Sequence, residues 1–98
     1  MTDRPQATTT IRIEDDGRVK AAEWAFAPGA ETGWHVHEYD YVVVPLVDGT
    51  LEIELPDGTT TTAALKQGIP YTRRAGVEHN VINAGPGEMR FLEVEITG

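Results

Sequence analysis

Residues 29–49, GAETGWHVHEYDYVVVPLVDG, decide the fold, and they place two histidines one residue apart ahead of a β-branched run. Side chains alternate between the two faces of an extended strand, so His35 and His37 point to the same side. The third histidine, His79, lies in a later stretch, residues 68–83, GIPYTRRAGVEHNVIN. Neutral imidazole is a common ligand of zinc, iron, copper and nickel. The pattern predicts a metal site if the fold returns His79 to the other two.

The rest of the chain shows the pattern of short strands separated by glycine and proline turns. Alternating or β-branched segments occur at residues 11–13, 19–27, 41–47, 51–55, 59–62 and 92–96. The only helical candidate is residues 63–67, which Gly68 ends. This spacing favours an all-β antiparallel sandwich or barrel. The acidic pairs Glu52/Glu54 and Glu93/Glu95 alternate with apolar residues and are predicted to face outward.

Length and composition describe one small domain, residues 1–98, whose residues 1–10 are expected to be a loose arm or an edge strand. The net charge of −8 argues against binding to nucleic acid or to an anionic membrane surface. No apolar run approaches the roughly 20 residues of a membrane span. The first residues lack the apolar core of a signal peptide, so a cytoplasmic location is expected. Without cysteine, a metal must be held by nitrogen and oxygen donors.

The two histidine stretches resemble the paired motifs of the cupin superfamily, G-x5-H-x-H-x(3,4)-E-x6-G and G-x5-P-x-G-x2-H-x3-N. The first motif corresponds to residues 29–49, where the glycines are Gly29 and Gly49. The second corresponds to residues 68–83, with Gly68, Gly76, His79 and Asn83 at its fixed positions. The resemblance implies a small single-domain cupin of the conserved-barrel type. Its implied fold is a double-stranded β-helix, or jelly-roll barrel.

The chain departs from these motifs at two positions. The motif glutamate, a metal ligand in many cupins, falls on Val42, and the motif proline falls on Arg74. The implied ligand set is therefore a three-histidine variant, His35, His37 and His79, holding one divalent ion (Fe, Zn, Ni or Mn). Asp40 is a candidate additional ligand if the loop after His37 is bent; otherwise it is solvated or paired with an arginine.

Other side chains near the motifs are candidates for a substrate pocket. They are Trp34, Tyr41, Tyr71, Arg73 and Arg74, and the default interpretation is core packing for the aromatic residues and solvation for the arginines. The aromatic residues are candidate walls of the barrel mouth. The two arginines are candidates for binding a substrate carboxylate through paired hydrogen bonds.

Two functions follow from this pattern. The first is a metal-dependent enzyme, such as a dioxygenase, that acts on a small anionic or dicarbonyl metabolite; three neutral imidazoles leave the charge of a divalent ion uncompensated and favour such a ligand. The second is a non-catalytic sensor or accessory protein that binds a metabolite or a metal. The family resemblance also implies a homodimer, to which the N-terminal arm could contribute a strand.

Overall fold

The computed structural model describes residues 3–98, which contain strands and turns but no helix, and therefore none that could span a membrane. The strands of this part of the chain are β1 (Thr8–Ile13), β2 (Val19–Phe26), β3 (His35–Val36), β4 (Tyr41–Pro45), β5 (Gly49–Glu54), β6 (Thr60–Leu65), β7 (Tyr71–Arg73), β8 (Glu78–Asn83) and β9 (Met89–Ile96). The predicted helical candidate is wrong, because its first three residues continue β6.

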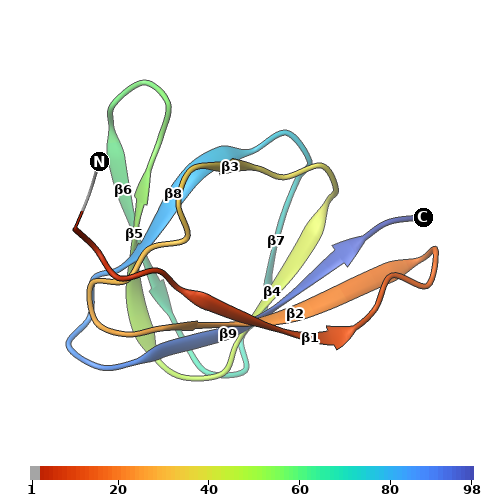
Figure 1. Ribbon diagram of the computed structural model, residues 1–98, viewed down its shortest axis with the longest axis horizontal. Coiled ribbons are helices and arrows are strands. Elements are labelled where there is room, and N and C mark those ends of the chain that lie inside the picture. Colours follow the sequence, from red (N-terminus) through yellow and green to blue (C-terminus); the bar gives the residue numbers. More distant parts are fainter. Residues whose placement is uncertain (1–2) are drawn as a thin grey trace.

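The strands form two antiparallel sheets that enclose a barrel (Figure 1). One sheet has the order β1-β2-β9-β4-β7 and the other β3-β8-β5-β6. After β2 the chain passes repeatedly from one sheet to the other, which is the winding of a jelly roll. The predicted all-β double-stranded β-helix is therefore confirmed.

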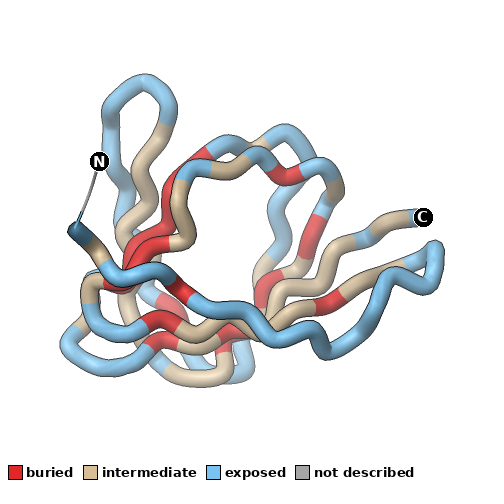
Figure 2. The backbone as a smooth tube through the Cα atoms, in the orientation of Figure 1, coloured by how far each residue is buried: buried red, intermediate tan, exposed pale blue. Residues whose placement is uncertain are grey.

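The core lies between the sheets and includes buried residues of β2, β4, β5 and β9 (Figure 2). Phe26 is fully buried, and its ring lies 5.5 Å from the ring of Phe91. Gly49, at the end of the first motif, is required for close packing: a Cβ atom there would lie 2.7 Å from the sulfur of Met89. Core packing thus explains this motif glycine.

The orientation of the side chains on β9 corrects one sequence prediction. Met89 and Phe91 face the core, and the same parity brings Glu93 into the barrel, where its side chain is only 12% exposed. The prediction that Glu93 faces outward is therefore wrong. Both faces of β9 carry apolar residues, and the contact of Phe91 with Phe26 determines which face is buried.

The N-terminal residues contact the rest of the barrel at two places. Strand β1 pairs with β2 and forms an edge of the five-stranded sheet. Before β1, Gln6 forms a parallel bridge with Glu31, in the segment that leads to β3. Residues 1–2, which belong to the expected arm, lie outside the described residues.

Candidate metal centre

Pairing between β3 and β8 brings the histidines together. In this antiparallel pair His35 lies directly opposite His79. His37 follows on the same side, and its main-chain amide donates a hydrogen bond to the carbonyl of Val77 at 2.9 Å. The Nε2 atom of His37 lies 3.0 Å from that of His35 and 3.2 Å from that of His79. Three imidazole nitrogens therefore converge from one edge of the four-stranded sheet.

These distances fit a bound metal ion. Metal–nitrogen bonds to histidine are about 2.0–2.1 Å long, so two donors on one ion lie roughly 3.0–3.4 Å apart for angles between octahedral and tetrahedral. The two measured separations fall in this range. His37 and His79 are buried and His35 is half-buried. The cluster can therefore hold one divalent ion on three nitrogen ligands.

The Nδ1 atoms of His35 and His37 have neighbours that suit this role. The Nδ1 atom of His35 lies 2.8 Å from the carbonyl oxygen of Gly33, which accepts a hydrogen bond when Nδ1 carries the proton. This tautomer leaves Nε2 of His35 free to bind a metal. The Nδ1 atom of His37 faces Oε1 of Glu93 at 4.0 Å. With Nε2 on a metal, the proton of His37 must lie on Nδ1, on the side of this carboxylate.

Burial keeps two of the histidines neutral. Burial, with a smaller contribution from the nearby His35, lowers the pKa of His37 to about 4. Burial likewise lowers the pKa of His79 to about 4, with smaller contributions from His35, His37 and Arg73. Protons therefore compete weakly with a metal for these nitrogens near neutral pH.

Glu93 is the residue of the site that sequence reasoning missed. Burial, together with the neighbouring Glu95, raises the pKa of Glu93 from 4.5 to about 7. A divalent ion on the histidines would stabilise its ionised form, so this carboxylate can offset part of the metal charge without coordinating the ion. The inward-facing Phe91, two residues earlier on β9, is the sequence signal that could have identified it.

A cavity of about 220 Å³ lies inside the barrel next to the cluster. Its lining is mostly apolar and includes His35, His79 and Glu93. The other lining residues are Trp24, Thr32, Tyr41, Val43, Leu51, Ile53, Leu55, Thr61, Tyr71, Arg73, Val77, Val81 and Phe91. This volume suits a small metabolite.

The structure brings only some of the predicted pocket residues to this cavity. Tyr41, Tyr71 and Arg73 line it, and the ring of Tyr41 stacks on His37 with centroids 3.9 Å apart. Trp34 and Arg74 are not among the lining residues, and the side chain of Trp34 is 55% exposed.

Asp40, the candidate extra ligand, does not join the histidine cluster. Its carboxylate accepts a hydrogen bond from the main-chain amide of Ala75 at 2.8 Å, outside the cavity. The bend after His37 thus directs Asp40 to the loop before β8.

The comparisons with known proteins agree with this architecture. The family model described as "Cupin domain" matches residues 22–95, so the protein belongs to the cupin family. The predicted family resemblance is confirmed.

Individual relatives are similar over nearly their whole length. The β-alanine degradation protein BauB of Pseudomonas aeruginosa is 56% identical over 96 residues, which cover 98% of this chain and 99% of the relative. The crystal structure of a cupin domain from Bordetella pertussis is 50% identical, with a TM-score of 0.92 and full coverage of both chains. A protein with a double-stranded β-helix domain from Klebsiella pneumoniae has a TM-score of 0.77 at 23% identity, covering all of this chain and 83% of its own. The last similarity concerns the fold alone.

The metal-free protein is predicted to lose stability as the pH falls. Between pH 6.5 and about 4, His37 and His79 bind protons in the unfolded chain but resist them in the folded one, so acid favours unfolding. Glu93 has the opposite effect on stability between pH 4.5 and about 7, because its carboxyl group binds a proton more readily in the folded chain. This one group offsets only part of the effect of the two histidines. The net proton uptake lowers the free energy of unfolding by roughly 2 kcal/mol between pH 6.5 and 4.5.

Urea unfolding in the presence of a chelator at these two pH values measures this difference. The His79→Gln variant keeps one of the two histidines and is expected to lose most of the dependence. Equal stability of the unmodified protein at both pH values would contradict the prediction.

Replacing Glu93 by glutamine is predicted to weaken metal binding, because it removes the negative charge facing His37 while preserving the shape of the side chain. The dissociation constant for a divalent ion should rise by about 10- to 100-fold, as for other partners of metal-bound histidines. Calorimetric titration measures it. Glu52→Gln is the matched control, since Glu52 lies between the inward-facing Leu51 and Ile53 and points to the other face of β5. Equal affinities of the two variants would show that Glu93 has no such role.

Proposed function

We propose that the protein is a metal-dependent dioxygenase that acts on a small anionic or dicarbonyl metabolite, with His35, His37 and His79 as the ligands of one metal ion. The observation that carries the proposal is the convergence of three Nε2 atoms beside a small, mostly apolar cavity. These three imidazoles would hold a divalent ion, and Fe(II) bound there would supply dioxygen chemistry beside the cavity.

Arg73 is proposed to orient the anionic end of the substrate. Its guanidinium group lies 4.6 Å from the centre of the Tyr71 ring, which holds its plane over the aromatic face. Arg73 lines the cavity while remaining exposed, so it stands where a ligand enters. A guanidinium held in this way can bind a carboxylate through two parallel hydrogen bonds.

Tyr41 is proposed to act as a hydrogen-bond donor inside the cavity. Burial raises the pKa of its hydroxyl well above the ordinary value, so the phenol keeps its proton. Its ring is fixed by stacking on His37. The apolar walls, which include Val43, Leu51 and Phe91, exclude water from the bound metabolite.

The similarity to the β-alanine degradation protein BauB supports a role in the degradation of β-alanine or of a comparably small compound. The cavity volume of about 220 Å³ is consistent with a compound of that size. We propose that this role is carried out in the cytoplasm.

Oxygen consumption tests the proposal. Metal-free protein is reconstituted with one equivalent of Fe(II) and assayed with a panel of small carboxylates that includes β-alanine. Oxygen uptake with one of them is expected, and it should fall at least 100-fold in the Arg73→Gln or His79→Gln variant, since each loses a contact of the reacting complex. A compound that raises the melting temperature without any oxygen uptake would contradict catalysis and indicate a non-catalytic binding protein.

We also propose that the protein forms a homodimer through the free edge of β1. All six residues of β1 are exposed, and Ile11 and Ile13 are 68% and 45% exposed. An open edge with apolar side chains is a template for pairing with a second strand. Separately, Val42, Val44, Leu92 and Val94 form a half-buried apolar outer face of the same sheet.

Light scattering is expected to give twice the chain mass of 10.7 kDa. Lysine at both Ile11 and Ile13 should produce monomers, because charged side chains on an edge oppose strand pairing. Ile69→Lys, which replaces an equally exposed isoleucine before β7, is the control and should leave the dimer intact. A monomeric unmodified protein, or a dimer that survives the double substitution, would contradict this interface.

A further inference from the structure

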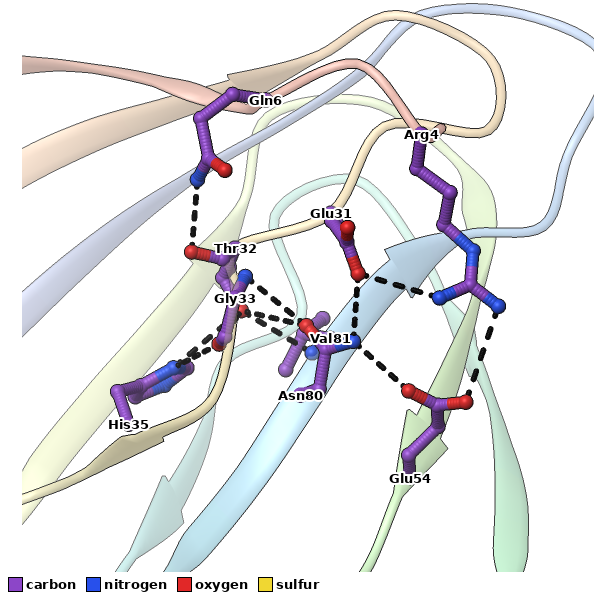
Figure 3. Close-up of polar contacts among 9 residues, drawn as sticks. All are labelled: Arg4, Gln6, Glu31, Thr32, Gly33, His35, Glu54, Asn80 and Val81. Atoms are coloured by element: carbon purple, nitrogen blue, oxygen red, sulfur yellow. Dashed lines mark hydrogen bonds and ion pairs between the residues drawn. The ribbon is translucent and has the colours of Figure 1, made fainter. Parts of the chain in front are cut away.

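The segment before β1 lies across the loop that leads to His35 (Figure 3). The amide of Ala7 donates to the carbonyl of Glu31 at 2.8 Å, and the amide of Glu31 donates to the carbonyl of Pro5 at 2.9 Å. The side-chain amide of Gln6 donates to the carbonyl of Thr32 at 2.7 Å. These contacts attach residues 5–7 to the main chain just ahead of the metal-binding strand.

Arg4 adds a charged contact to this attachment. Its Nη1 atom lies 3.2 Å from Oε1 of Glu31, and its Nη2 atom lies 3.8 Å from Oε2 of Glu54. The Nδ2 group of Asn80 donates to both of these carboxylates, at 2.7 Å to Glu31 and 2.8 Å to Glu54. Two negative groups thus meet at one amide nitrogen, and Arg4 supplies the positive charge that offsets their repulsion.

The other end of the Asn80 amide contacts the loop itself. Asn80 is only 2% exposed, and its Oδ1 atom accepts a hydrogen bond from the main-chain amide of Gly33 at 2.9 Å. The carbonyl of Gly33 in turn lies 2.8 Å from Nδ1 of His35. A continuous set of polar contacts therefore runs from Arg4, through Glu31, Glu54 and Asn80, to the ring of His35 (Figure 3).

We propose that Arg4 is a positioning residue that holds the loop carrying His35 in its metal-binding conformation by keeping Glu31 and Glu54 together on Asn80. The inference rests on the proposed metal centre for its effect on affinity, but the loop conformation can be measured without metal. It gives the N-terminal segment a role in the site although Arg4 does not contact the histidines. Without Arg4, repulsion between the carboxylates of Glu31 and Glu54 displaces the side chain of Asn80 and weakens its hydrogen bond with the amide of Gly33.

The test replaces Arg4 by glutamine and measures binding of Zn²⁺ alone by competition with a chromophoric chelator. The expected change is about a tenfold weaker affinity, at the lower end of the effects seen for groups that orient metal ligands. The matched control is Arg12→Gln, because Arg12 also forms an ion pair with a glutamate, Glu23, at 3.0 Å but lies on β1, away from the cluster. The control should bind Zn²⁺ as the unmodified protein does.

A second substitution separates charge from packing. In the Arg4→Gln protein, Glu54→Gln removes one of the two repelling charges and leaves an amide oxygen to accept from Asn80. The double variant should recover most of the lost affinity. If Arg4 acts only by covering the loop, the second substitution restores nothing, and the proposal is overturned.

Hydrogen exchange of the Gly33 amide in the metal-free protein gives a readout independent of metal. Exchange should be faster in Arg4→Gln than in the unmodified protein. It should be unchanged at Ala75, whose amide donates to the side chain of Asp40 in another loop. If Gly33 exchanges at the same rate in both proteins, Arg4 does not position the loop. If the unmodified protein binds no Zn²⁺, the proposed metal centre fails, and the Gly33 measurement still decides whether Arg4 holds the loop.

Discussion

The pairing of β3 with β8 is the interaction on which the rest of the site depends. It places His35 opposite His79, and a shift by one residue would turn the rings to opposite faces of the sheet. Because β3 is only two residues long, this pairing cannot hold the register by itself. Hydrogen bonds on either side, from Thr32 to Val81 and from His37 to Val77, extend it along β8. The site is therefore positioned by both flanking loops as much as by the strand.

Charge in this cupin is distributed differently from what its motif implies. The motif glutamate position is Val42, which pairs with Val94 on the outer face of the five-stranded sheet. The neighbouring Tyr41 points inward and stacks on His37. The carboxylate near the cluster comes instead from Glu93 on β9, at 4.0 Å from Nδ1 of His37. A metal here would be bound by neutral ligands, with negative charge close by in the cavity wall.

Local strand patterns predicted the all-β class, and the resemblance to the cupin motifs predicted the jelly-roll barrel and the return of His79 to His35 and His37. Strand alternation and the spacing of His35, His37, His79 and the motif glycines are visible in a linear reading. Glu93 was missed because both faces of β9 carry apolar residues, and the parity it shares with Phe91 identifies the buried face only once Phe91 is known to contact Phe26. The contacts of Asn80 join residues 26 to 49 positions apart, so no local pattern reports them. The outward position of Trp34 likewise follows from the bend of the loop.

X-ray absorption spectroscopy at the metal edge, on protein purified without an affinity tag and loaded with one equivalent of metal, tests the central claim most directly. The account predicts one tightly held ion per chain whose spectrum fits three imidazole nitrogens at about 2.0–2.1 Å. A spectrum that requires fewer than three imidazoles, or metal that washes out before measurement, would contradict it.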